Sequence, residues 1–203
     1  MRVVLGIDGS APSLIAHQLL LEASWPRPLE VALVATYERP IDWSGTIPVV
    51  MSVDDEEAMR RDLTDMLDGL AEPLRAAGIV PELVVREGSA AHVLEDVARE
   101  RRADLLLVGN RGRGPARSAF LGSVSASLVD HAPCPVLVAR RPRVERLLLA
   151  TDGTSTADRA ADIFLRWRIF RNAPVDVVSV APHRRSTAET LVTPWSVSGD
   201  LRD

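Results

Sequence analysis

Residues 104–132, DLLLVGNRGRGPARSAFLGSVSASLVDHA, join an apolar run, a glycine-rich loop and a helical segment, and this order decides the fold. The run at 104–110 is typical of a strand buried on both faces of a parallel sheet. The loop contains Gly109, Gly112, Gly114 and Gly122, and a helix is predicted from Ser123 onward. Glycine lets a ligand approach the main chain, and the first N–H groups of a helix lack partners. The pattern therefore favours phosphate binding, with a tight surface turn as the alternative.

The rest of the N-terminal region repeats the strand and helix pattern. Apolar runs predict further strands at 2–7, 29–37, 80–88 and 135–140, and helical segments are predicted at 9–24, 54–78 and 90–103. Residues 39–53, with two prolines and a glycine, are expected to form a surface connection. The alternation predicts an α/β fold: an open, doubly wound, Rossmann-like sheet of five parallel strands in the order 3-2-1-4-5, with helices on both faces.

Two of the predicted helices have recognisable ends. The helix at 9–24 is expected to be capped by Ser10 and to face the core with Leu14, Ala16, Leu20 and Leu21. The helix at 54–78 has an acidic first turn and ends at Gly78, and Pro73 is expected to kink it.

An internal repeat predicts two units. VVLGIDGSAPS (3–13) recurs as LLLATDGTSTA (147–157), which aligns Asp8 with Asp152, and PLEVALVAT (28–36) recurs as PVDVVSVAP (174–182). The second copy contains only strand, helix and strand before a dissimilar tail. We therefore expect a complete domain at 1–142 and an incomplete repeat at 143–203, which lacks a glycine loop and should not bind a nucleotide alone.

Composition excludes several functions. The net charge of −4 argues against a nucleic-acid or membrane-surface partner, and the chain has no lysine, which excludes a Walker P-loop. The single cysteine, Cys134, cannot form an internal disulfide and is expected to be buried rather than reactive. The apolar run at the N-terminus stops at Asp8, too short for a signal peptide or a membrane span, so a cytoplasmic location is expected.

The unusual residues gather after the first and fourth predicted strands. GIDGS follows the first and GNRGRG follows the fourth. In a doubly wound sheet these strands flank the point where the strand order reverses, which is where ligands bind. A nicotinamide-dependent oxidoreductase is disfavoured, because its glycines would follow the first strand.

The spacing of Gly109, Gly112, Gly122 and Ser123 resembles the ATP-binding branch of the universal stress protein family. The resemblance extends to GIDGS (6–10), to APCPVLV (132–138), and over residues 1–140 as a whole. It implies that the glycine loop and the following helix hold ribose and phosphates, with Asp8 on the adenosine side. Thr36 falls beside adenine, where the family commonly has a small apolar residue.

The resemblance implies a binding set at these strand and helix ends: Ile7, Asp8, Gly9, Ser10, Thr36, Val108, Gly109, Arg111, Gly112, Arg113, Gly122, Ser123, Val124 and Ser125. Arg111, Arg113 and Arg117 are expected either to screen phosphates or to be solvated. No residue is assigned a catalytic or metal-binding role, except that Asp8 is a candidate for contact with Mg²⁺ carried by the nucleotide. The histidines have no metal-ligand spacing.

These observations predict a nucleotide-binding regulator, and the resemblance implies that it binds ATP, or AMP or ADP, and acts in the stress response. Catalysis is less well supported, because no second carboxylate or histidine stands near the loop, so at most a slow ATPase is expected. An alternative is a scaffold that dimerises through the apolar fifth strand, PVLVAR (135–140), whose edge invites pairing with a second copy. Homodimers of this kind are usual in the family that the chain resembles.

Overall fold

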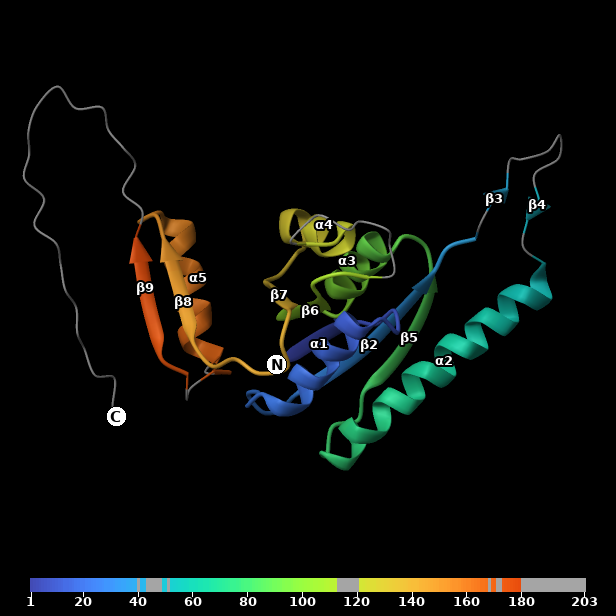
Figure 1. The fold of residues 1–203 in the computed structure, drawn as a ribbon, viewed down its shortest axis with the longest axis horizontal. Helices are drawn as coiled ribbons and strands as arrows, with labels where there is room; N and C mark the ends of the chain where they lie inside the picture. Colours follow the sequence, from blue (N-terminus) through green and yellow to red (C-terminus); the bar gives the residue numbers. More distant parts are fainter. Residues whose placement is uncertain are drawn as a thin grey trace, which may run out of the picture.

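The computed structural model describes residues 1–39, 41–42, 49–50, 52–112, 121–167, 169–170 and 173–179 (Figure 1). Its main sheet has five parallel strands in the order β5-β2-β1-β6-β7. The strands are β1 (Arg2–Gly6), β2 (Glu30–Tyr37), β5 (Glu82–Glu87), β6 (Leu105–Gly109) and β7 (Val136–Ala139). This arrangement confirms the predicted fold class and the predicted strand order.

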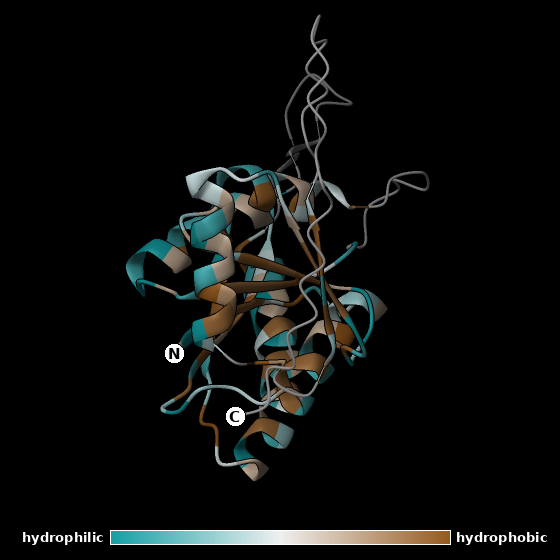
Figure 2. Ribbon diagram, turned by 90° about the vertical axis from the view of Figure 1, so that its left-hand side faces the viewer, coloured by the Kyte–Doolittle hydropathy of each residue, from teal (hydrophilic) through white to brown (hydrophobic). Residues whose placement is uncertain are grey.

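Four helices cover the two faces of this sheet: α1 (Ala11–Glu22), α2 (Val53–Ala76), α3 (Ala90–Glu100) and α4 (Ser123–His131). Alternate residues of each strand face opposite layers. Val3, Leu5 and Leu33 form one core layer with residues of α1 and α2, whereas Val4 and Val34 belong to a second layer with α3 and α4. Figure 2 shows the apolar strands between helices whose polar residues face outward.

One sequence expectation about the first helix needs correction. Leu14 is 42% exposed, and His17 is buried instead, with its Nε2 atom 2.8 Å from the Leu70 carbonyl oxygen. The helix face that meets the sheet runs through positions 13, 16, 17 and 20, which turns residue 14 toward solvent. Pro73 lies inside α2, and the helix continues beyond it to Ala76.

The connection predicted at 39–53 contains a short hairpin. Strands β3 (Ile41–Asp42) and β4 (Val49–Val50) pair antiparallel, and α2 begins at Val53. Figure 1 shows this hairpin beyond the first turn of α2. Tyr37, at the end of β2, donates a hydrogen bond of 2.7 Å to Glu56 in that turn, and Arg39 pairs with both Glu56 and Glu87. These contacts join the start of α2 to the ends of β2 and β5.

A second, smaller unit consists of β8 (Leu147–Thr151), α5 (Ser155–Trp167) and β9 (Val175–Ser179). Its two strands pair parallel, as β1 and β2 do. The turn after each first strand is the same: Ser10 N–H lies 3.0 Å from Asp8 Oδ1, and Thr154 N–H lies 3.0 Å from Asp152 Oδ1. This repeated geometry is what a duplicated strand and helix would produce.

The repeat alignment of the second strands is wrong by an even number of residues. Aligning 28–36 with 174–182 would place Val177 in the position of Val31. In the structure Leu147 pairs with Val175 as Val3 pairs with Val31, so Val175 holds that position. An even shift leaves every side chain on the same face of a strand, so the apolar pattern alone could not distinguish the two alignments. Residues 180–182 of that comparison, like His183, lie outside the described residues.

The second unit contacts the first domain near the end of α1. Ile169 is 7% exposed and belongs to the core layer of α1 and α2, against which Trp167 and Phe170 also pack. Arg143 forms an ion pair of 2.5 Å with Glu22 at the last residue of α1. By contrast, every residue of β9 is exposed, and α5 has no buried residue among those described.

Candidate functional site

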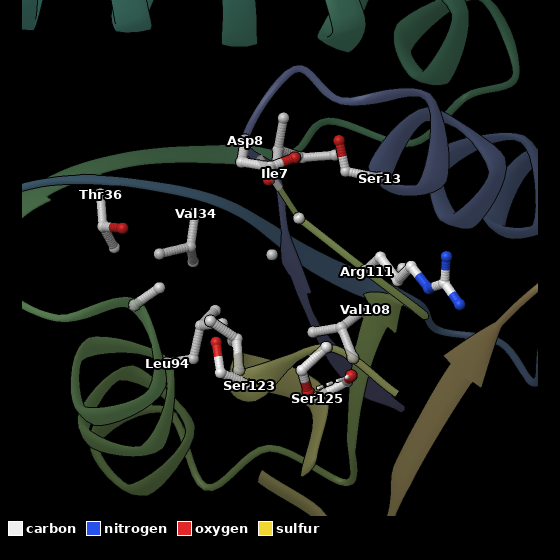
Figure 3. A pocket seen from close by; sticks show the side chains of 16 residues that line it. Ile7, Asp8, Ser13, Val34, Thr36, Leu94, Val108, Arg111, Ser123 and Ser125 are labelled. Atoms are coloured by element: carbon white, nitrogen blue, oxygen red, sulfur yellow. Dashed lines mark hydrogen bonds between the residues drawn. The ribbon is translucent and has the colours of Figure 1, made fainter. Parts of the chain in front are cut away.

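A cavity of about 420 Å³ opens at the carboxyl ends of β1, β2 and β6 (Figure 3). It lies where the strand order reverses between β1 and β6, the position expected for a ligand in this class of sheet. Its walls come from these strands and the turns that follow β1 and β6, from the first turn of α1, from α3 and from the start of α4: Gly6, Ile7, Asp8, Ser13, Val34, Thr36, Ala90, Leu94, Val108, Gly109, Arg111, Gly112, Gly122, Ser123, Val124 and Ser125.

Most of the residues proposed from the sequence lie in this lining. Gly9 and Ser10 do not, and Arg113, like Arg117, falls outside the described residues. The lining also contains residues that the sequence analysis did not single out: Gly6, Ser13, Val34, Ala90 and Leu94. Val34 could have been found, because it shares a face of β2 with Thr36; Ala90 and Leu94 depend on how α3 packs.

Asp8 is held in place by the turn that follows β1. Its Oδ1 atom accepts hydrogen bonds from the Ser10 main chain at 3.0 Å and from the Ser10 hydroxyl at 2.6 Å. Gly9 makes this turn possible with a φ of 73°, in the left-handed region that favours glycine. Gly9 and Ser10 therefore orient the Asp8 carboxylate without lining the cavity themselves.

At three glycines of the loop, another part of the protein lies too close to leave room for a side chain. A Cβ atom on Gly109 would stand 2.5 Å from the main-chain carbon of Pro12, and one on Gly122 would stand 3.1 Å from Cα of Arg111. On Gly112 it would stand 2.7 Å from Oδ2 of Asp8. At Gly109 and Gly122 the close neighbour is therefore the protein's own main chain, and both residues also line the cavity.

The start of α4 offers free main-chain donors to the cavity. The N-cap residue is Gly122, so no side chain caps the helix, and the N–H of Gly122 bonds to the Asn110 carbonyl oxygen at 2.8 Å. The N–H groups of Ser123 and Val124 make no hydrogen bond with the described residues. Two such donors at the positive end of a helix favour an anion.

The cavity lining combines apolar and polar side chains. Val34, Leu94 and Val108 contribute apolar side chains, while Asp8, Arg111 and Ser123 contribute polar ones. Figure 3 shows Thr36 and Arg111 at opposite ends of the labelled side chains. Such a lining suits a ligand that has both an apolar portion and an anionic portion.

Metal and thiol chemistry find little support in the described part of the chain. There, no group of three or more His, Cys, Asp or Glu residues is placed to hold a metal ion. Cys134 packs beside the second core layer, and burial raises the pKa of its thiol to about 11. This thiol therefore stays protonated near neutral pH, as expected for a packing residue.

Comparison with known proteins decides the family. The model of the universal stress protein family matches residues 1–140. The chain belongs to the universal stress protein family. A universal stress protein of Thermus aquaticus is 32% identical over 139 residues, which is 68% of this chain and 97% of that protein.

Other members of the universal stress protein family cover different shares of the chain. One from Mycobacterium tuberculosis (strain H37Rv) is 28% identical over 153 residues, which is 70% of this chain and 44% of that protein. The crystal structure of one from Archaeoglobus fulgidus covers 90% of this chain and 68% of its own, with a TM-score of 0.65 and 18% identity. A Burkholderia pseudomallei structure has a TM-score of 0.51 at 24% identity and covers 68% of this chain and 93% of its own. These structures support the fold.

Among the described helices, none combines the length and the apolar character that crossing a membrane requires.

Proposed function

We propose that the cavity binds an adenine nucleotide, ATP or its mono- or diphosphate, and that occupancy regulates the protein. The observation that carries the proposal is the pair of N–H groups at Ser123 and Val124, which make no hydrogen bond with the described residues and belong to residues that line the same cavity as Asp8. The phosphates would lie against these donors and the Ser123 hydroxyl, and the ribose would lie beside Asp8 and Gly112. Arg111 adds positive charge to this end of the cavity.

The rim of the cavity supports binding better than catalysis. Asp8 is the only carboxylate in the described lining, and it already accepts two hydrogen bonds from Ser10. Phosphoryl transfer needs a positioned nucleophile and a metal ion that is held in place. Asp8 could contact Mg²⁺ carried by the nucleotide, but a single carboxylate supports at most slow hydrolysis of ATP.

The test places a negative charge at the proposed phosphate site. Ser123→Asp should reduce the affinity for ATP by at least about a hundredfold, because a carboxylate at the start of α4 occupies the positive end of the helix and repels phosphate. The fold should survive, since an acidic residue in the first turn stabilises a helix. Calorimetry with ATP and Mg²⁺, and chromatography of nucleotide released by denaturing the purified protein, provide the readouts.

Ser89→Asp is the matched control. Ser89 precedes α3, is exposed, and lies outside the cavity lining, so this variant adds the same charge at another helix N-terminus. It should bind ATP like the wild type. A wild-type protein that carries no nucleotide and binds neither ATP nor AMP would contradict the proposal.

A dimerising scaffold remains a second candidate function, favoured by the edge of β7. This strand pairs with β6 on one side, and the described residues place no strand on its other side. Val136, Leu137 and Val138 are half-buried there. Light scattering should show a dimer in which Leu137→Arg, but not Ser123→Asp, shifts the mass to that of a monomer; a wild-type monomer would exclude this candidate.

The domain organisation is part of the proposal. We infer a nucleotide-binding domain over 1–142 and an incomplete second repeat over 143–203, with nucleotide bound by the first unit alone. The common turn at Asp8 and Asp152 supports duplication, and the second unit has no counterpart of the glycine loop.

A further inference from the structure

Two hydroxyl groups in the cavity make no hydrogen bond with the described residues. They belong to Thr36 and Ser123. The other two hydroxyls of the lining are engaged, since Ser13 donates to the Ser10 carbonyl oxygen at 2.9 Å and Ser125 donates to the Gly122 carbonyl oxygen at 3.0 Å. Ser123 belongs to the start of α4, whereas Thr36 lies at the end of β2, opposite Arg111 among the labelled side chains of Figure 3.

The strand pattern sets the position of Thr36. Ala32 and Val34 lie on the face of β2 that packs against α3, and Thr36 is the next residue on the same face. It is half-buried, and it lines the cavity together with Val34 of the same strand and with Ala90 and Leu94 of α3. Figure 3 shows the Thr36 hydroxyl oxygen directed toward the side on which Val34 lies.

The surroundings of this hydroxyl restrict the chemistry that it can meet. Apolar walls on β2 and α3 suit a flat aromatic ring, and the polar edge of such a ring needs a hydrogen-bonding partner when it leaves water. A threonine hydroxyl both donates and accepts, and it can rotate to do either. It can therefore pair with an amino group or with a carbonyl oxygen on the same edge.

We propose that the Thr36 hydroxyl determines base specificity: it hydrogen-bonds the 6-substituent of a purine base and accepts 6-amino and 6-oxo purines alike. This inference rests on the proposed function, because it takes the anionic portion of the nucleotide to lie at α4. It adds a ligand class, since the site would take inosine monophosphate as well as AMP.

Threonine also favours β-strands, and this preference alone would explain a β-branched residue at the end of β2. The two roles separate in Thr36→Val, which keeps the branched shape and removes the hydroxyl. Thr36→Ser does the reverse, because it keeps the hydroxyl and removes the methyl group. A purely structural residue would be replaced better by valine than by serine.

The experiment measures the binding of three ligands by calorimetry: AMP, inosine monophosphate and the monophosphate of purine riboside, which has only hydrogen at position 6. Wild type should bind AMP and inosine monophosphate within about threefold of each other, and the third ligand about tenfold more weakly, as expected for one lost hydrogen bond. Thr36→Val should weaken the binding of AMP and inosine monophosphate about tenfold and leave the affinity for the third ligand unchanged. Thr36→Ser should keep the wild-type preference for AMP and inosine monophosphate over the third ligand.

Thr64→Val is the control, since Thr64 lies on α2 outside the cavity lining and should leave all three affinities unchanged. The inference is overturned if Thr36→Val binds AMP and inosine monophosphate as tightly as wild type does, or loses all three ligands equally. It is also overturned if wild type binds AMP but discriminates strongly against inosine monophosphate. Wild type that binds none of the three contradicts the proposed function itself.

Discussion

Gly109, the last residue of β6, lies directly against the main chain of Pro12 in the first turn of α1. A methyl group on Gly109 would stand 2.5 Å from the Pro12 carbonyl carbon, 2.6 Å from its oxygen and 2.8 Å from the Ser13 nitrogen. These are main-chain atoms, which cannot rotate away. The contact fixes the start of α1, and with it the Asp8 turn, against the end of β6.

Gly109→Ala should therefore destabilise the fold. Because α1 or β6 would have to move, we expect a loss of about 3 kcal/mol in the free energy of unfolding, measured by urea denaturation. Gly69→Ala is the control, since Gly69 lies in α2 and a Cβ there would meet nothing within 4 Å. That variant should gain about 0.5–1 kcal/mol from helix propensity. Equal stability of the two variants would show that the contact is not rigid.

Gly112→Ala should act on binding more than on stability. Its Cβ would stand 2.7 Å from Oδ2 of Asp8, a side-chain atom that can move only by disturbing the bonds of the same carboxylate to Ser10. We expect the affinity for AMP to fall at least about tenfold, while the free energy of unfolding changes by less than about 1 kcal/mol. Calorimetry and urea denaturation on the same preparation test both parts. Unchanged affinity would mean that Asp8 need not hold this position.

Much of the fold could be predicted because it depends on local patterns. Apolar runs such as 104–110 define the strands, and their alternation with helices leaves few sheet orders open. The role of Gly109 could not be predicted in the same way. Its neighbour, Pro12, is distant in sequence, and a glycine required by the protein's own main chain looks the same in a sequence as one required by a ligand.

The burial of single helix residues also depends on packing. The sequence does not indicate whether His17 lies inside the protein or at its surface, and the structure buries it between α1 and α2, where the carbonyl oxygen of Leu70 provides a partner. In the cavity, the ends of β1 and β6 were predictable from GIDGS and GNRGRG. The wall formed by Ala90 and Leu94 was not, because it depends on how α3 lies across the sheet.

The burial of His17 predicts a pH dependence of stability. Desolvation lowers the pKa of this imidazole below its ordinary value of 6.5. The unfolded chain therefore binds a proton at a higher pH than the folded chain does. The contribution of His17 to the free energy of unfolding is complete above about pH 6.5. It is lost as the pH falls toward the pKa of His17 in the folded state, which lies below 6.5.

Urea denaturation at about pH 7.5 and about pH 5.5 tests this dependence. His17→Gln should lose less stability than wild type over this interval, because its amide can bond to the Leu70 carbonyl oxygen without titrating. His92→Gln is the control, since His92 is exposed on α3. If the His17 and His92 variants follow the same pH dependence, His17 makes no contribution of this kind.

The contact between the second unit and the first domain should depend on apolar packing rather than on charge. Ile169 is 7% exposed and packs with the core layer of α1 and α2, whereas Arg143, in its ion pair with Glu22, has a side chain that is 76% exposed. Removing buried methylene groups from isoleucine costs about 2–4 kcal/mol, and an exposed ion pair contributes less than about 1 kcal/mol. Ile169→Ala should therefore loosen the second unit, and trypsin should cleave the linker after Arg140 at least about tenfold faster than in wild type. Arg143→Ala removes one possible trypsin site and should leave cleavage after Arg140 close to the wild-type rate. Equal rates in the two variants would mean that the apolar contact at Ile169 does not hold the units together, whereas a faster rate only in Arg143→Ala would assign that role to the ion pair.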